Sequence, residues 1–254
     1  MPTSPLSLYE PLQTLQAIGD QIWIVDGPIV ALSMYGAAIP FPTRMTIVRL
    51  QNQDLWCHSP IELTPALQAQ VDQLGPVRHL VSPNKLHYAH INPWAAAYPE
   101  AITWAAPGVR ARAASQGIVA PFRADLADTA PPDWSADLEQ RIFRGSRFMA
   151  EVVFFHRASS TLIVTDLIEN FELDKVSPRW HWLLQLMGIA APEGQMPLDL
   201  RLTFWGRHEQ AREGYQQLLA WQPERIVLAH GRWCDRQGTA ALQRAFRWLG
   251  PPEG

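Results

Sequence analysis

The chain has 254 residues, of which 47% are hydrophobic and 18% charged, and its formal net charge is −3 at pH 7. This composition is typical of a globular protein, and the slight negative charge gives no electrostatic case for nucleic-acid binding. No apolar run approaches the roughly 20 residues of a membrane span, and residues 1–15 lack the pattern of a signal peptide. Two cysteines, Cys57 and Cys234, are too few for a disulfide framework, so we expect reduced thiols and a cytoplasmic protein.

The first part of the chain predicts strands and then a strand–helix–strand unit. Thr64 is positioned to cap a helix whose first residue is Pro65. An apolar segment punctuated by Gly and Pro, residues 29–42, predicts a loop that covers a sheet edge or lines a pocket. The order of a βαβ unit places functional residues at the carboxyl ends of its strands. We expect strands at residues 21–25, 45–50, 55–58 and 77–81, and a helix at 65–74.

The rest of the chain continues the pattern of strands followed by helices, and no linker divides it. We therefore predict a single domain over residues 1–254, an α/β fold with two packed sheets and helices outside. The Trp-rich helix at 177–187 has an apolar face that packs against the core or a partner, which leaves a homo-oligomer open. We expect strands at residues 102–105, 142–143, 151–155, 161–165 and 225–229, and helices at 94–98, 107–116, 177–187, 206–221 and 238–249.

Two imidazoles, His87 and His90, follow the apolar strand at 77–81, after a break at Pro83 and Asn84. If residues 86–91 form a helical turn, the two side chains share one face. Neutral imidazoles that converge at the end of a buried strand suit a borderline metal such as zinc or iron. The alternative is that both are capping or surface histidines.

Two further polar residues come at the ends of apolar strands. Asp166 directly follows the strand at 161–165, and it either binds a cation or caps the residues that come next. His230 follows the strand at 225–229 and precedes Gly231, which allows a sharp turn that points the imidazole into a cleft. The alternative for His230 is a hydrogen-bonded core histidine. Because His87, His90, Asp166 and His230 all belong to strand-end loops, we predict a metal site with these four ligands.

This pattern resembles the metallo-β-lactamase fold over nearly the whole chain, from residue 21 to the closing helix. The segment ending in Asp166 is similar to the bridging-aspartate motif of that fold, and Leu228-Ala-His230-Gly231 is similar to its final histidine motif. More closely, the chain resembles a branch of the superfamily described as a domain of unknown function, with the same Pro-Asn…His loop. The resemblance implies a four-layer αββα sandwich with its site at the edge of both sheets. Most members of the superfamily are metal-dependent hydrolases.

The chain departs from the family's His-x-His-x-Asp-His motif. Asn84 and Lys85 stand near the places of the first two histidines, and His87 comes near the Asp-His end. The middle histidine of the fold belongs in residues 145–151, where this chain offers Arg147 or Glu151. A full two-metal site is therefore not expected, and we predict one ion, zinc or iron. The motif aspartate that orients the metal-bound water is also missing, so no catalytic base is assigned.

Other residues surround the predicted site. His58 could support a ligand or be one, with a packed core histidine as the alternative. Tyr88 and Trp233 either shape a substrate pocket or pack in the core. Lys85 could pair with Asp166 and replace the charge of a metal. His156, in the turn between two strands, is expected at the surface.

Two functions fit these residues. The first is a metal-dependent, hydrolase-like enzyme with an atypical site that holds a single ion and acts on a small molecule that the sequence does not identify. The second is a member of the fold that has lost catalysis and binds a ligand or a partner. The broken histidine motif favours the second, and the presence of His87, Asp166 and His230 favours the first.

Overall fold

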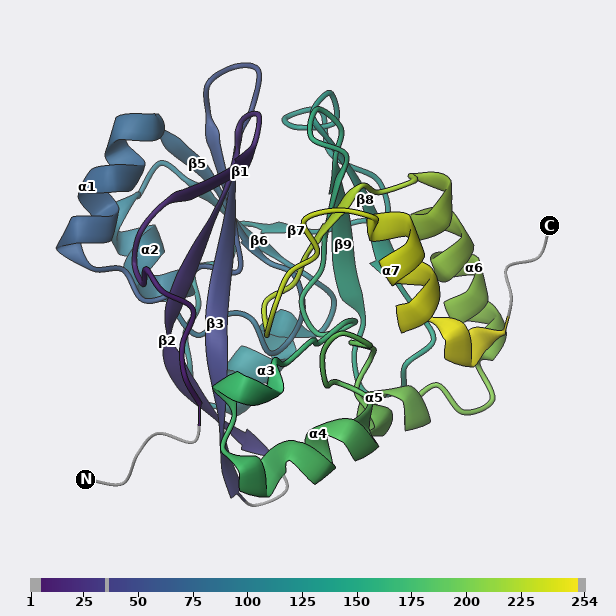
Figure 1. The fold of residues 1–254 in the computed structure, drawn as a ribbon. Coiled ribbons are helices and arrows are strands. Elements are labelled where there is room, and N and C mark those ends of the chain that lie inside the picture. The colour runs from purple at the N-terminus through teal and green to yellow at the C-terminus, as the bar shows by residue number, and fades with distance from the viewer. Residues whose placement is uncertain (1–5, 35–36, 251–254) are drawn as a thin grey trace.

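Two β-sheets lie face to face with helices on their outer sides (Figure 1), in a computed structural model that describes residues 6–34 and 37–250. Only the backbone is described at 32–34 and 37–38. The arrangement is the four-layer αββα sandwich that the sequence predicts. Among the described residues, no helix has the length and apolar character needed to cross a membrane.

The first sheet has seven strands in chain order. Its first four strands pair antiparallel and its last four pair parallel, so β4 belongs to both arrangements. The strands are β1 (Gln16–Gly19), β2 (Ile22–Met34), β3 (Ala37–Arg49), β4 (Leu55–His58), β5 (Val77–Ser82), β6 (Ile102–Ala105) and β7 (Ala124–Asp125). The unit β4–α1–β5 is the predicted βαβ unit, with α1 at Pro65–Leu74 and the Thr64 hydroxyl accepting from the backbone of Leu67.

The prediction of a loop at residues 29–42 is wrong for the described residues 29–34 and 37–42, which belong to β2 and β3 and pair with one another as a long hairpin. Residues 35–36 lie outside the described residues. The prolines of the hairpin are tolerated for two reasons. Pro28 falls at a shift of register between Gly27 and Ile29, and bulges accept proline. Pro40 and Pro42 lie in the part of β3 that has no β4 partner, since β4 pairs only with Thr46–Arg49 by register. The hairpin extends to the lower edge of the molecule in Figure 1, beside α4.

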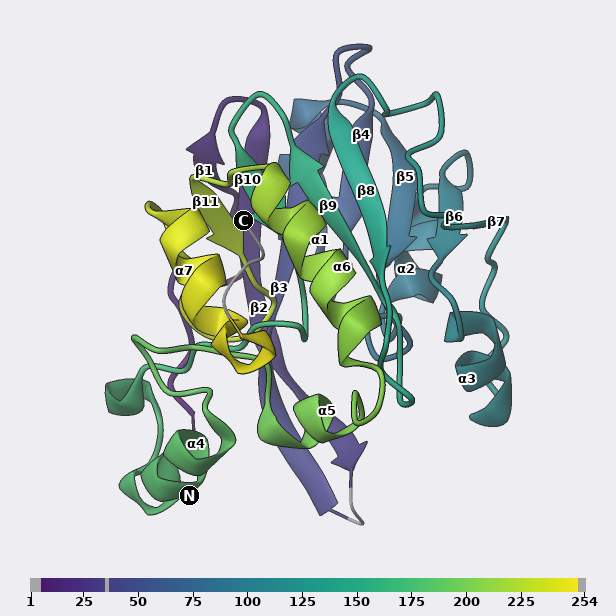
Figure 2. The same cartoon turned by 90° about the vertical axis from the view of Figure 1, so that its right-hand side faces the viewer.

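The second sheet has the order β11–β10–β9–β8, with β8 (Leu138–Phe143), β9 (Glu151–His156), β10 (Thr161–Ile163) and β11 (Arg225–Val227). β10 and β11 pair parallel, whereas β9 pairs antiparallel with both β10 and β8. Helices α6 (His208–Ala220) and α7 (Gly238–Ala245) cover its outer face (Figure 2). Helices α1, α2 (Ile91–Ala97) and α3 (Val109–Ser115) lie on the side of the first sheet.

Large aromatic side chains lie among the aliphatic residues of the core between the sheets. Trp56 of β4 and Phe154 of β9 are fully buried and meet edge to face, with ring centroids 4.7 Å apart. Trp134 packs against Trp56 from the loop before β8. A second buried cluster lies between β8–β11 and the helices α6 and α7, where Tyr215 stacks on Phe246. Together the two clusters hold the strand ends of both sheets in fixed positions.

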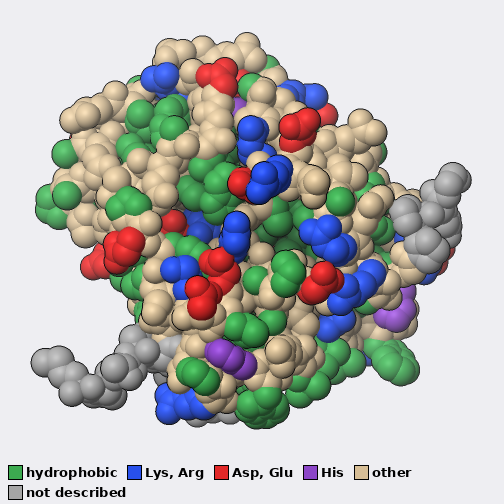
Figure 3. All heavy atoms as spheres, viewed as in Figure 1, with side chains coloured by type: hydrophobic (Ala, Val, Ile, Leu, Met, Phe, Trp, Pro, Cys, Tyr) green, Lys and Arg blue, Asp and Glu red, His purple; other side chains and the backbone are tan. Residues whose placement is uncertain are grey.

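The Trp-rich segment is only partly as predicted. Helix α4 spans His181–Met187, after a 3₁₀ turn at Pro178–Trp180, and α5 follows at Leu198–Leu202. Trp182 is 62% exposed and does not face the core. Hydrophobic side chains gather along the lower edge of the molecule over α4 and α5 (Figure 3), and the exposed ones include Trp182, Leu186, Leu202 and Trp205.

Candidate metal centre

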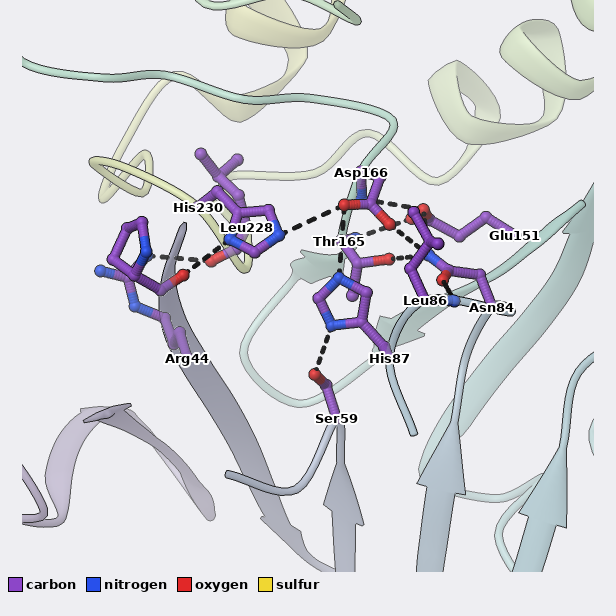
Figure 4. A network of polar contacts seen from close by, with 11 residues as sticks. Arg44, Ser59, Asn84, Leu86, His87, Glu151, Thr165, Asp166, Leu228 and His230 are labelled. Atoms are coloured by element: carbon purple, nitrogen blue, oxygen red, sulfur yellow. Dashed lines mark hydrogen bonds and ion pairs between the residues drawn. The ribbon is translucent and has the colours of Figure 1, made fainter. Parts of the chain in front are cut away.

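Three segments far apart in the chain deliver polar side chains to one place at the edge of the two sheets (Figure 4). His87 lies in the turn at residues 85–90 that follows β5. Asp166 and His230 each come three residues after the end of a strand, β10 and β11 respectively. Because β10 and β11 are parallel neighbours, their carboxyl ends reach the same edge, and the two side chains come together there.

The two imidazoles converge on one carboxylate oxygen. His87 Nε2 and His230 Nε2 each lie 3.3 Å from Asp166 Oδ1, and the ring centroids are 5.2 Å apart. One ligand atom from each of the three residues lies within 4.8 Å of the other two, a spacing at which the group could hold a metal ion. In the part of the chain that the structure describes, no other group of His, Cys, Asp and Glu has this spacing.

The far nitrogen of each ring is held by a second partner. His230 Nδ1 lies 2.7 Å from the carbonyl oxygen of Pro42 in β3. A carbonyl oxygen only accepts, so Nδ1 carries the hydrogen and donates it. His87 Nδ1 lies 2.7 Å from the hydroxyl of Ser59, which follows β4. Hydrogen bonds of this kind fix the orientation of metal-binding histidines in proteins.

A buried polar network stands behind Asp166. The side-chain amide of Asn84 donates to Asp166 Oδ2 at 2.6 Å, and it also lies 3.2 Å from Glu151 Oε2. The backbone N–H of Leu86 donates to Asn84 Oδ1, which fixes the amide with its nitrogen toward the acids. Glu151 accepts from the backbone N–H groups of Thr165 and Asp166 at 2.7 and 2.9 Å. The network fixes Asp166 from the side opposite the histidines.

The surroundings of Asp166 and Glu151 shift the pKa values of these two carboxyl groups in opposite directions. Burial opposes ionisation of Asp166, but the neighbouring His87 and His230 outweigh it and hold the pKa of this carboxyl well below its usual range. Burial and the negative charge of Asp166 raise the pKa of Glu151. For His87, burial favours the neutral ring, but the charge and hydrogen bond of Asp166 prevail and raise its pKa. Asp166 is thus the anion of the cluster, and it favours a cation between itself and the two rings.

His90 is not part of this cluster. Helix α2 begins only at Ile91, and His90 is the residue that precedes it. Residues 85–90 form a hydrogen-bonded turn that is not part of the helix, so the α-helical spacing that would place His87 and His90 on one face does not apply. The His90 ring is partly buried, its Nε2 has no hydrogen-bond partner, and burial lowers its pKa.

The other predicted residues occupy different positions. Lys85 does not pair with Asp166; its Nζ lies over the ring of Phe148, 3.7 Å from the centroid. His58 is buried in the core, where it stacks on Trp56, and burial lowers its pKa to about 3. Tyr88 is buried, with its hydroxyl donating to Gln116. Trp233 is half-buried against the core beside β11.

Arg147, Glu151 and His156 lie at positions that the structure defines. Of Arg147 and Glu151, only Glu151 contacts the polar network, because Arg147 is exposed. His156 is 1% exposed, so its expected surface position is wrong. Its ring is held in the β9–β10 turn by the Ser159 hydroxyl, 2.8 Å from Nδ1.

Sequence reasoning missed Ser59, Thr165 and Pro42. Ser59 directly follows the strand that ends at His58, so its place after a strand is a signal that could have been used. Pro42 takes part through its backbone carbonyl, which no side-chain pattern reveals.

The family and the fold are both identified by comparison. Residues 19–179 match the family model described as domain of unknown function (DUF4336), and the chain belongs to this family. It has the metallo-β-lactamase fold. No curated protein matches the chain.

Solved structures of metallo-β-lactamases share the fold over almost the whole chain. The enzyme from Erythrobacter litoralis, with beta mercaptoethanol in its active site, has a TM-score of 0.64 and 13% identity, covering 96% of this chain and 99% of that chain. FIM-1 from Pseudomonas aeruginosa, in a mono-zinc form, has a TM-score of 0.61 and 16% identity, covering 94% and 96%. The enzyme from Pontibacter korlensis has a TM-score of 0.60 and 17% identity, covering 96% and 99%. At these identities the likeness is one of fold.

Proposed function

We propose that the protein is a metal-dependent, hydrolase-like enzyme that holds a single zinc or iron ion between His87, Asp166 and His230. The proposal rests on the chemistry of these three side chains. The fold supports it by analogy, since fold alone does not determine an activity.

The observation that carries the proposal is the orientation of the His230 ring. Its Nδ1 donates to the carbonyl oxygen of Pro42, so in the neutral ring Nε2 has a lone pair and no hydrogen. That lone pair faces Asp166 Oδ1 at 3.3 Å. Two acceptors in contact repel each other unless a cation lies between them. The cation is either a proton on Nε2 or a metal ion bound to both atoms.

The donor set fits a metal ion. Two imidazole nitrogens and one carboxylate oxygen are ligands that zinc and iron accept. The backbone carbonyl behind His230 and the hydroxyl behind His87 are the outer partners that such ligands need. Three protein ligands leave a coordination position open, as in catalytic sites. When bound, the ion would supply Lewis-acid activation of a water molecule for hydrolysis.

The residues beside the cluster favour one ion over two. The Asn84 nitrogen points at both acids, and an amide N–H is a donor that cannot ligate a cation. Glu151 is already engaged by two backbone N–H groups. This chain's residues would thus bind and orient one ion, while Asn84 holds the Asp166 carboxylate and Glu151 holds the backbone N–H of Asp166.

A second candidate is a member of the fold that binds a ligand or a partner without catalysis. The observation in its favour is that Asp166 has hydrogen-bonding partners for both of its oxygens, from His87, His230 and Asn84. With protons on both imidazoles, the cluster would be a stable charged network that needs no metal.

The two cysteines bear on the compartment of the protein. Cys57 and Cys234 are separate free thiols. Because reduced thiols are typical of cytosolic proteins, we propose that the protein is cytoplasmic.

Elemental analysis of protein purified without added metal tests the proposal. We expect about one zinc or iron per chain in the wild type and a loss of most of it in His230→Ala and His87→Ala, because three ligands are the fewest for such a site. His90→Ala and Lys85→Ala should keep the metal. His208→Ala, at an exposed histidine, is the control for the substitution itself. Wild-type protein with no metal, both as purified and after dialysis against zinc, would favour the second candidate.

A further inference from the structure

Exposed apolar side chains gather over α4 and α5, along the lower edge of the molecule (Figure 3). Trp182 and Leu186 lie four residues apart on α4, so they share its outer face. Trp205, which comes soon after α5, is 72% exposed. Tryptophan is highly buried on average in globular proteins, and a continuous exposed apolar surface marks a binding site. We call this surface the Trp ridge, and its members are Phe148, Trp180, Trp182, Leu186, Leu202 and Trp205.

Hydrogen bonds hold the segments of the Trp ridge together. The Arg201 guanidinium of α5 donates to the carbonyl oxygen of Met187, the last residue of α4, at 3.3 Å. The loop before β9, which has Phe148, is bound to the end of α5: the backbone N–H of Arg147 donates to the Thr203 carbonyl oxygen at 3.0 Å. The ridge is therefore one surface with its side chains at fixed places.

The Trp ridge is basic, although the chain as a whole is slightly acidic. Its segments have four arginines and one acidic residue, Asp199, whereas the whole chain has a formal net charge of −3. These segments are residues 145–149, 178–187 and 198–207. Three of the arginines are exposed, and among the described side chains no ion pair involves them: Arg147, Arg179 and Arg207. Their charge is available to a partner.

The arginines lie among the aromatic side chains of the ridge. The guanidinium carbon of Arg179 lies 5.6 Å from the centroid of the Trp180 ring. Arg147 Nη2 lies beside Gly206, the residue next to Trp205, since a Cβ placed on Gly206 would be 3.7 Å from it. Aromatic and cationic side chains on one surface suit the membrane interface, where tryptophan lies at the level of the headgroups and arginine pairs with acidic lipids.

The same charges argue against a second copy of this chain as the partner. In a twofold-symmetric dimer the same patch lies on both sides of the interface. The Trp ridge would then place its arginines opposite those of the other copy, with Asp199 as the only acidic residue of these segments to offset them. Like charges brought together at an interface oppose association, whereas an anionic surface neutralises them.

We propose that the Trp ridge docks the protein on the surface of an anionic lipid membrane. Trp182 and Trp205 enter the headgroup region, and Arg179 and Arg207 pair with acidic headgroups. The attachment is peripheral, through side chains on the outer faces of short helices.

Docking places the candidate metal centre near the membrane surface. Leu184 and Met187, on the inner face of α4, pack against the same buried cluster as Phe41. The Phe41 ring in turn lies 5.1 Å from the ring of His230, measured between centroids. The inference itself does not depend on a bound metal or on the proposed activity.

Co-sedimentation with lipid vesicles tests the proposal. Vesicles of phosphatidylcholine and phosphatidylglycerol in equal parts supply the anionic surface, and vesicles of phosphatidylcholine alone are the neutral reference. We expect the wild type to bind the anionic vesicles at least about tenfold more tightly than the neutral ones. Binding should weaken as salt is added, because salt screens exposed charges.

Arginine variants test the contribution of charge. Arg179→Gln and Arg207→Gln should each weaken binding to the anionic vesicles by about fivefold. Arg123→Gln is the matched control, because Arg123 is also exposed and lies next to β7, on the side of the molecule away from α4 (Figure 2). It should bind as the wild type does.

The double variant Trp182→Ala/Trp205→Ala tests the aromatic contribution and should weaken binding by about tenfold or more. Val119→Ala, at a 90% exposed apolar residue outside the ridge, is its control. The proposal is refuted if the wild type binds neither kind of vesicle or both equally, or if the double variant, shown to be folded by its melting curve, binds as tightly as the wild type. It is also refuted if the wild type sediments as a dimer and the double variant as a monomer, because the ridge would then be an interface between copies.

Discussion

Arg44 and Asp26 form a buried ion pair across the β2–β3 hairpin, with Nη2 2.8 Å from Oδ1. The same guanidinium donates through Nη1 to the carbonyl oxygens of Leu228 and Gly231 at 2.9 and 2.8 Å. These two carbonyls flank His230, so the hairpin holds the final loop of the candidate site by both its Arg44 side chain and its Pro42 carbonyl. Arg44 is therefore a positioning residue for His230.

Replacement of Arg44 should destabilise the fold and weaken metal binding together. Arg44→Met leaves Asp26 buried without its partner, which costs about 3–5 kcal/mol in the free energy of unfolding. Urea unfolding measures this cost, and elemental analysis measures the metal. Arg44→Lys is the control: it can keep the ion pair but cannot donate to both carbonyls as well, so its effect should be intermediate. Wild-type stability and metal content in Arg44→Met would show that the loop does not depend on this residue.

Glu169 makes stability depend on pH. Burial is the main cause that raises its pKa from 4.5 to about 8. The folded protein therefore binds a proton at this carboxyl more tightly than the unfolded chain does. Its contribution to stability is fully present below pH 4.5 and is lost as pH rises to about 8, by up to about 1.4 kcal/mol for each pH unit.

The variant Glu169→Gln removes this titration. Its free energy of unfolding should change less between pH 5 and pH 8 than that of the wild type, and it should be the more stable of the two at pH 8. Urea unfolding at several pH values measures both curves. Parallel curves for the two proteins would mean that Glu169 does not carry the effect.

Two tryptophans should respond to substitution in opposite ways. Trp56 is fully buried between the sheets, whereas Trp182 is 62% exposed on α4. Trp56→Ala removes a large core side chain and should cost about 3–5 kcal/mol. Trp182→Ala should change stability by no more than about 0.5 kcal/mol. Thermal melts of both variants measure these changes in stability. A strong loss of stability in Trp182→Ala would show that a partner or another segment covers α4.

Residues 1–254 should behave as one domain. The core between the sheets takes side chains from both halves of the chain, such as Trp56 and Phe154. Neither half can bury these side chains alone. Limited proteolysis should therefore give no stable half. Recovery of two fragments that each unfold cooperatively would contradict the prediction.

The sequence predicts the carboxyl ends of β4 and β5 to within one residue because the signals there are local, and it extends β10 and β11 by two residues each. Apolar runs define all four strands, and the polar residues that come soon after them mark the edge of the sheets. The rule that parallel strands present their carboxyl ends together then brings Asp166 beside His230. The metallo-β-lactamase fold could be recognised for the same reason, even though its histidine motif is broken.

The features that the sequence does not reveal depend on tertiary contacts. Proline at positions 40 and 42 argues against a strand unless one knows that this part of β3 has no β4 partner. The sequence offers Arg147 or Glu151 at the place of the fold's middle histidine and does not show that Glu151 accepts hydrogen bonds from the backbone N–H groups of Thr165 and Asp166. His90 was expected beside His87 on the assumption of a helical turn at residues 86–91, but α2 begins only at Ile91, four residues after His87.

Anomalous X-ray scattering tests the central claim most directly, in crystals of the wild type grown with zinc and measured at the zinc absorption edge. We predict a single peak at about 2.0–2.2 Å from His87 Nε2, His230 Nε2 and an Asp166 oxygen. The His230→Ala variant, treated in the same way, should lose the peak. The account is contradicted if the wild type has no peak at this place while Asp166 keeps its direct hydrogen bonds to both imidazoles.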